Sequence, residues 1–178
     1  VGFGFRLADW QEAFQLLVEH ARREGFASLD YRPVPPWYHR APGEEDVFWF
    51  EHPDRRCVAS VIPTSILPIP ASVPFNESRR QALGAARRSG LEVKQSAASL
   101  VPVMELVAET LARRYQASPV HSSGEMEWLH RRFPGRIRGY CIEPDGVPVA
   151  AIVLFVEKTC LKLQYVGHAA GCPPGAME

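Results

Sequence analysis

Three consecutive strand-like segments near the C-terminus constrain the fold more than any other part of this sequence. They are Arg136–Ile142, Val147–Val156 and Cys160–Gly167. Glu143–Gly146 has proline and glycine where a type I turn prefers them, and Glu157–Thr159 is short enough for a hairpin. The sequence therefore predicts a three-stranded meander.

The residue types in these segments predict how each strand is buried. Val147–Val156 is almost entirely apolar, so we expect both of its faces to be covered. In the last segment apolar residues alternate with others, which predicts a single apolar face. That face would consist of Leu161, Leu163 and Tyr165.

After the last strand the chain is rich in small residues. Gly167–Glu178 contains glycine, proline and alanine, and it has no cation other than a possible histidine. A strand that leads through a glycine-rich turn into a helix can bind a pyrophosphate, because free backbone N–H groups point at the ligand. Glycine and proline clusters are more often ordinary turns, so both interpretations stay open here.

Composition excludes several classes of protein. The 178 residues can bury a core, in one domain or two small ones. The 20 basic and 20 acidic residues cancel, so no overall field favours DNA or an anionic membrane. The four cysteines show no CxxC spacing, which is typical of reduced thiols and predicts a cytoplasmic protein. Residues 57–76 carry no charge but contain four prolines, which argues against a membrane-spanning helix.

The first 75 residues contain signals for a helix and several strands. Ser28–Arg32 is expected to form a short strand, and Asp46–Glu51 with Cys57–Ile62 a hairpin. A proline-rich segment follows and continues through Phe75. We expect a domain boundary there, since linkers often have this composition.

A basic helix is predicted after that segment. Asn76 is a suitable N-cap, and Gly90 is expected to end the helix. Arg80 and Arg87 lie on one side of it, with alanines opposite. This side could contact an anionic substrate or coenzyme phosphates, although basic helix faces are more often only solvated. Leu91–Lys94 could form a short strand.

Two more helices are predicted before the meander. Apolar residues spaced by three and four positions from Leu100 to Leu111 predict the first of them. Ser122 and Glu125 match a capping box at the start of the second. Pro134 and Gly135 are expected to end it.

The order of these elements resembles that of the GNAT acyltransferases, and in particular the FemAB-like branch, whose members carry two GNAT-like units in tandem. The motifs that carry the resemblance are Arg32–His39, Glu44–Asp46, Ser78–Arg80, Gly90–Val93, Pro119–Ser122, Glu125, Phe133–Pro134, Gln164–Tyr165, Gly171 and Gly175–Ala176. The resemblance implies an α/β (α+β) fold with a mixed central sheet flanked by helices. Residues 1–75 would be the C-terminal part of a first unit. Residues 76–178 would be the N-terminal part of a second unit, cut at the cofactor-binding turn, as in a fragment of a longer protein.

The same resemblance implies a reaction. An acyl group, acetyl or aminoacyl, would pass from coenzyme A or from aminoacyl-tRNA to an amine of a small molecule or peptide. The turn departs from the family's phosphate motif, because His168 and Gly171 fit it loosely and Pro173 stands where a free N–H is wanted. The alternative is therefore a catalytically degenerate module that binds a ligand or dimerises. Unpaired strand edges would also need cover, either because the two parts of the chain pair with each other or because a second copy covers them in a homodimer.

Three residues are candidates for catalysis under this resemblance. His121 could be a general base, since the ordinary pKa of histidine suits proton removal near neutral pH, or it could bond the backbone of its loop. Glu125 could orient His121 or act as the base, although the capping box already explains it. Tyr165 could protonate a thiolate leaving group, or it could be a core aromatic.

The remaining candidates concern binding. The donor is expected to contact the last strand and the turn after it, at Gln164, Val166, Gly167, Gly171, Gly175 and Ala176. The substrate is expected to contact Arg80 and Arg87. The spacing of histidine and acidic residues supports no metal site, so we expect no metal.

Overall fold

The computed structural model describes residues 6–39, 41, 43–50, 60, 63–70, 74–173 and 175–176. The chain divides into two compact units, Val1–Ile66 and Leu67–Glu178. The division falls within the proline-rich segment. The interpretation of the first unit as part of another GNAT-like copy stays a prediction.

The first unit is organised around aromatic rings. Its elements are α1 (Leu7–Arg23), the 3₁₀ turn η1 (Pro36–Tyr38) and α2 (Glu45–Phe50). Phe14 of α1 is buried, and its ring lies 5.2–5.3 Å from those of Tyr31, Trp49 and Phe50. The Tyr31 hydroxyl donates to Asp46 at 2.7 Å. Burial and the Asp46 charge both raise the pKa of Tyr31.

The strands predicted for this unit are wrong where the structure describes them. Ser28–Arg32 has no regular structure, and the first half of the predicted hairpin, Asp46–Glu51, overlaps helix α2. Glu45 and Asp46 favour a helix N-terminus because their charges complement the helix dipole. The aromatic residues of α2 then pack against α1. The second half, Cys57–Ile62, lies outside the described residues apart from Ser60.

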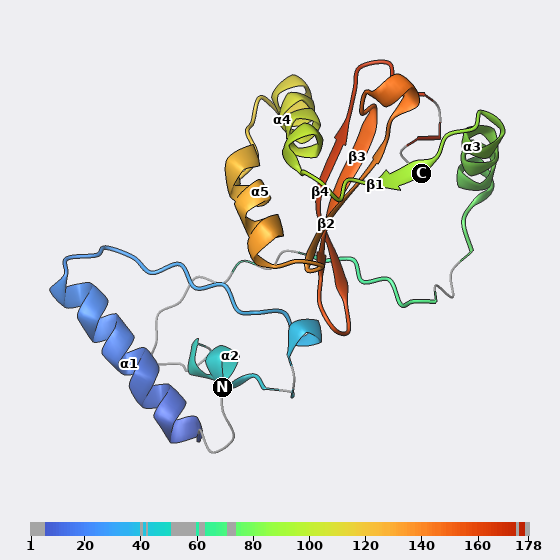
Figure 1. Ribbon diagram of the computed structural model, residues 1–178. Coiled ribbons are helices and arrows are strands. Elements are labelled where there is room, and N and C mark those ends of the chain that lie inside the picture. The colour runs from blue at the N-terminus through green and yellow to red at the C-terminus, as the bar shows by residue number, and fades with distance from the viewer. Residues whose placement is uncertain are drawn as a thin grey trace. The chain divides into compact units, whose positions relative to one another are not determined.

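The second unit is a four-stranded sheet with helices beside it. Its strands are β1 (Val93–Gln95), β2 (Ile137–Ile142), β3 (Ala150–Val156) and β4 (Leu161–His168), in that spatial order. Its helices are α3 (Glu77–Arg88), α4 (Val101–Tyr115) and α5 (Ser123–Arg132), with the short turn η2 (Pro144–Gly146) between β2 and β3. Helices α4 and α5 lie on the same side of the sheet, and α3 lies beside the C-terminal segment (Figure 1). The α+β class is confirmed, but each strand pair is antiparallel, so the described strands do not form the mixed sheet that the resemblance implies.

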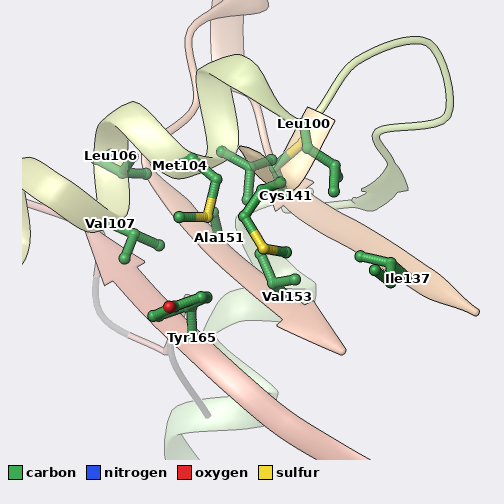
Figure 2. Close-up of a cluster of buried hydrophobic side chains, with 11 residues drawn as sticks. Leu100, Met104, Leu106, Val107, Ile137, Cys141, Ala151, Val153 and Tyr165 are labelled. Atoms are coloured by element: carbon green, nitrogen blue, oxygen red, sulfur yellow. The ribbon is translucent and has the colours of Figure 1, made fainter. Parts of the chain in front are cut away.

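The core of this unit lies between α4 and the sheet. Leu100, Val103 and Val107 are fully buried, which confirms the apolar spacing predicted for this helix. They belong to one cluster with side chains of the sheet, including Cys141, Val153 and Tyr165 (Figure 2). Burying one valine or leucine side chain contributes about 1.5–3 kcal/mol. The packing of α4 on β4 therefore fixes the strand that carries three of the six candidate donor-binding residues.

A β-bulge interrupts the alternation predicted for β4. Tyr165 pairs with Val153, whereas Leu163 pairs with Leu154, so Gln164 is an extra residue without a partner. The residues on either side of the bulge therefore face opposite sides of the sheet. Tyr165 is 9% exposed and Leu163 is 55% exposed. The prediction that they share a face is wrong, and the bulge is the reason.

Two further expectations for the meander need correction. In β3, Ala151 and Val153 are buried against α4. On the other face Ala150 is buried but Ile152 is only part-buried, so that face is covered only in part. The turn before β3 is not type I, because Asp145 has φ 58° and ψ 27°. Aspartate tolerates this left-handed conformation, since its short polar side chain can hydrogen-bond locally.

Two local capping signals, at Asn76 and Ser122, were predicted correctly. The side chain of Asn76 accepts a hydrogen bond from the Arg79 N–H at 2.9 Å, at the start of α3. Ser122 and Glu125 form the reciprocal capping box at the start of α5. These contacts involve residues three positions apart, which is why the sequence alone predicts them.

Glu127 of α5 caps the start of α4, a contact with no local signal. Its carboxylate accepts hydrogen bonds from the Leu100 N–H at 2.7 Å and from the Ser99 hydroxyl at 3.1 Å. Arg131 donates to it at 2.8 Å. The Leu100 N–H, more than the other partners, holds the pKa of Glu127 below its usual range.

We expect Glu127→Gln to destabilise the protein by about 1 kcal/mol at pH 7, because the hydrogen bonds lose their charge. Because the pKa of Glu127 is lowered in the folded state, its carboxylate stabilises the fold at pH values above the unfolded-state pKa of about 4.5. This contribution disappears as the pH falls through the folded-state pKa. Urea unfolding at pH 7 and near pH 3 measures the difference. Glu105→Gln, at an exposed position of the same unit, is the control. A difference that does not shrink in acid would contradict this account.

Candidate active site

The structure brings two of the predicted catalytic residues into direct contact. His121 lies in the loop between α4 and α5, and Tyr165 lies in β4, 44 positions later. The Nδ1 atom of His121 is 2.6 Å from the hydroxyl oxygen of Tyr165. The backbone N–H of His121 donates to the same oxygen at 3.2 Å. The two rings meet edge to face, with centroids 6.0 Å apart.

This geometry allows His121 to accept a proton from a ligand and Tyr165 to donate one. A phenol oxygen has two lone pairs and carries one proton. The backbone N–H of His121 donates to one lone pair of the Tyr165 oxygen. When Nδ1 of His121 is protonated, the ring N–H donates to the other lone pair. In that tautomer the Tyr165 proton points away from His121, and Nε2 of His121 has a free lone pair. The pair then offers a ligand one proton acceptor and one proton donor.

Two local features place this pair. The bulge at Gln164 turns Tyr165 toward α4, where its ring lies near Val107 (Figure 2). Ser122, the N-cap of α5, directly follows His121 and fixes its backbone at the entry to the helix. His121 is part-buried, so its ring lies at the edge of the core and not within it.

Glu125 lies close to the pair but contacts Ser122. Its carboxylate accepts hydrogen bonds from the Ser122 N–H at 2.9 Å and from the Ser122 hydroxyl at 3.2 Å. The Ser122 N–H is the main cause of its lowered pKa, and the nearby His121 adds a smaller effect. In this geometry Glu125 caps the start of α5 and so holds the loop that contains His121.

Gly167 is required by packing between α4 and β4. A Cβ atom at this position would lie 2.8 Å from both the Cα and the N of Val107. Any side chain here would push the strand away from the helix. Val166, the preceding residue, faces the opposite side of the sheet and is 38% exposed.

The segment after β4 forms two consecutive turns. The Cys172 N–H donates to the Ala169 carbonyl at 3.3 Å, and the Ala176 N–H donates to the Pro173 carbonyl at 3.1 Å. Gly171 has φ 77°, as a left-handed turn position requires. Two of the N–H groups that could bind a phosphate are therefore used within the segment itself.

Gly175 brings this segment against α3. Its φ is 84°, and an added Cβ would lie 2.2 Å from the carbonyl oxygen of Ala82. Ala176 lines an apolar pocket of about 150 Å³ together with Tyr140, Ile152 and other residues of the sheet. The predicted donor-binding turn thus lies between the sheet and α3.

Gln164 differs from the other candidates because part of its side chain is unsatisfied. Its Oε1 atom is buried and has no hydrogen-bond partner among the described residues. The residue is part-buried and forms the bulge next to Tyr165. Buried polar atoms usually have partners, so this oxygen calls for an explanation.

Three residues of α4 that the sequence analysis missed bind the end of β4. Thr110, buried, accepts a hydrogen bond from the His168 N–H at 2.8 Å. Arg113 donates to the His168 carbonyl at 2.6 Å, and Arg114 lies 3.2 Å from the Nε2 of His168. Basic residues are common in the last turn of a helix, where they complement the dipole, so this pair gave no distinct signal. Two guanidinium groups therefore lie where β4 leads into the turn.

Arg80 and Arg87 lie on exposed positions of α3. Arg80 pairs with Glu77, and Arg87 lies in the last turn of the helix. In the described structure no contact joins either of them to His121 or Tyr165. The alanine side of α3 instead faces Gly175, so the helix does lie beside the turn after β4.

The described residues contain neither a candidate membrane span nor a candidate metal cluster. No helix in the described part is both long enough and apolar enough to cross a membrane. No group of three or more histidine, cysteine, aspartate or glutamate side chains lies close enough to hold a metal ion there.

Comparison with known families gives one match. The model of a family described as an acetyltransferase (GNAT) domain matches residues 76–171. This stretch is more than half of the chain and contains α3, β1, α4, α5 and β2–β4. No curated protein matches the chain.

Proposed function

Because this chain belongs to the acetyltransferase (GNAT) family, we propose that it transfers an acyl group from a coenzyme A thioester to a primary amine. The observation that carries the proposal is the contact between His121 and Tyr165. It combines a base and an acid at one point of the sheet edge, as amine acylation by a thioester requires. The FemAB-like branch is the subfamily that we propose for it.

The reaction needs two proton movements, and the pair supplies both. The Nε2 of His121 takes a proton from the amine as its nitrogen attacks the thioester carbonyl. The new C–N bond forms, the C–S bond breaks, and the leaving sulfur takes the hydroxyl proton of Tyr165. The Nδ1 proton of His121 then passes to the Tyr165 oxygen. The products are an amide and a free thiol, and both side chains end neutral.

The other candidates would hold the donor and the substrate. We assign Val166, Gly167, Gly171, Gly175 and Ala176 to the path of the donor along β4 and its turn. Arg113 and Arg114 would supply the positive charge that the turn itself lacks, so they are the residues we add for the donor phosphates. Arg80 and Arg87 on α3 would face an anionic part of the substrate.

One observation favours a second candidate function, a binding module without catalysis. Pro173 has no N–H, and the N–H groups of Cys172 and Ala176 already donate within the segment. A turn with few free donors would bind a pyrophosphate weakly. In that case the His121–Tyr165 contact would serve only the packing of the α4–α5 loop.

Thiol release from acetyl-CoA tests the choice between these functions. The protein is mixed with acetyl-CoA and each of a panel of primary amines, and free thiol and acylated amine are measured together. The proposal predicts amine-dependent thiol release with an equal amount of acylated amine. Binding of acetyl-CoA by calorimetry without any such release would favour the binding module. If the protein neither binds acetyl-CoA nor releases thiol from it, coenzyme A is refuted as the donor.

A further inference from the structure

The bulge in β4 decides which side chain lies next to Tyr165 on its face of the sheet. Tyr165 pairs with Val153, and Lys162 pairs with Phe155. Val153 belongs to the buried cluster (Figure 2), and Phe155 packs against that cluster. Residues directly opposite each other in an antiparallel pair share a face, so Lys162 lies on the face of Tyr165. Without the bulge, strict alternation would place Leu163 there instead.

Lys162 therefore brings a primary amine to the face that carries the candidate site. The residue is exposed, and no side chain among the described residues forms a hydrogen bond or ion pair with its ammonium group. Neighbouring positions on one face of a strand are about 7 Å apart, a span that the flexible four-carbon stem of lysine can cover. A primary amine is also the acceptor in the proposed reaction.

We propose that Lys162 is a self-acylation site, at which the protein transfers the acyl group to its own Nζ. This inference rests on the proposed function, whose proton movements it shares. Nζ reacts in its neutral form, so its ammonium proton first passes to water. The nitrogen then attacks the thioester carbonyl and loses a proton to the Nε2 of His121. The C–N bond forms, the C–S bond breaks, and the leaving sulfur takes the hydroxyl proton of Tyr165. The Nδ1 proton of His121 passes to the Tyr165 oxygen, and each chain ends with one amide and releases one thiol.

The two other lysines of the chain are internal controls for this site. Lys94 lies in β1, at the other edge of the sheet from β4, and Lys158 lies in the turn before β4. Both are exposed, so acetyl-CoA in solution reaches them as easily as it reaches Lys162. Any preference for Lys162 must then come from its position beside the pair, because holding an amine near the reacting groups accelerates its reaction.

Incubation of the full chain with acetyl-CoA, without an added amine, tests the proposal. Mass spectrometry of peptides measures the acetylation of each lysine over time. Lys162 should be acetylated faster than Lys94 and Lys158. In His121→Ala its rate should fall by about 10²–10⁴-fold, the effect of losing a general base, or to the chemical background seen at Lys158. The rate per chain should stay the same on dilution of the protein, because the amine and the pair belong to one chain.

Lys162→Arg keeps the positive charge and removes the acceptor. Thiol release from acetyl-CoA without an added amine should fall to the background level in this variant, and its melting temperature should stay unchanged. Three results would overturn the proposal. They are equal acetylation of the three lysines, an unchanged rate at Lys162 in His121→Ala, and a rate per chain that rises in proportion to the protein concentration.

The assay with added amines keeps this outcome separate from that of the proposed function. Acylation of an added amine without acetylation of Lys162 would overturn the self-acylation alone. If neither the added amine nor Lys162 is acylated, the proposed function fails and the self-acylation fails with it.

Discussion

Replacing His121 by alanine is expected to lower turnover by about 10²–10⁴-fold, the range for loss of a general base. The substitution removes the Nε2 lone pair and also the ring N–H that occupies the Tyr165 oxygen. His121 is part-buried in a loop, so the melting temperature should stay nearly unchanged. The rate of thiol release and a thermal melt of the same sample measure both quantities.

His130 is a matched control for this experiment. Its Nδ1 lies 2.8 Å from the Ile137 carbonyl and its Nε2 lies 3.2 Å from the Ala97 carbonyl, so its contacts connect α5 to the sheet. His130→Ala should therefore lower the melting temperature and leave the turnover of folded protein unchanged. A turnover loss below about threefold in His121→Ala, with the fold intact, would exclude His121 as the base, given the expected range.

The largest effect on stability is expected for Gly167→Ala. The added Cβ would lie 2.8 Å from two backbone atoms of Val107, and backbone cannot move away as a flexible side chain can. Overpacking a core costs about 1–3 kcal/mol, and a clash with backbone should reach or exceed the upper value. Urea unfolding measures it as a lower midpoint at an unchanged slope.

Gly124→Ala is the matched control for that change. Gly124 lies in the first turn of α5, and a Cβ there would meet nothing within 4 Å. Alanine favours a helix over glycine by up to about 1 kcal/mol, so this variant should gain stability. Equal unfolding midpoints for Gly167→Ala and the wild type would contradict the close contact between α4 and β4.

The sequence predicted the features that depend on neighbouring residues. The caps at Asn76 and Ser122 and the apolar face of α4 follow from spacings of three or four positions. Such signals act within one helix turn, and no distant residue alters them. The three strands of the meander were predicted for the same reason, since short turns connect them.

Features that depend on distant partners could not be predicted in this way. The bulge at Gln164 arises from the register of β4 against β3, which no pattern within β4 reports. The run Asp46–Phe50 suits a strand by its residue types, but packing of its aromatic rings against Phe14 makes it helical. The contacts of Arg113 and Arg114 with His168 join residues more than 50 positions apart.

The candidate site contains features of both kinds, some set by neighbouring residues and some by distant partners. His121 and Tyr165 were each proposed from their residue type and motif, and nothing in the sequence indicated that they touch. Their contact depends on the bulge, which turns Tyr165 toward the α4–α5 loop. Glu125 was also proposed as a catalytic candidate. The capping box predicted from the sequence accounts for the hydrogen bonds that it makes with Ser122.

A double-mutant cycle on the pair tests the central claim most directly. Turnover is measured for wild type, His121→Ala, Tyr165→Phe and the double variant, with Tyr115→Phe at an exposed position as control. If the two side chains form one proton relay, removing either one disables it. The double variant should then lose about as much turnover as the more impaired single variant. A loss equal to the product of the two single losses would show two independent residues and contradict the relay.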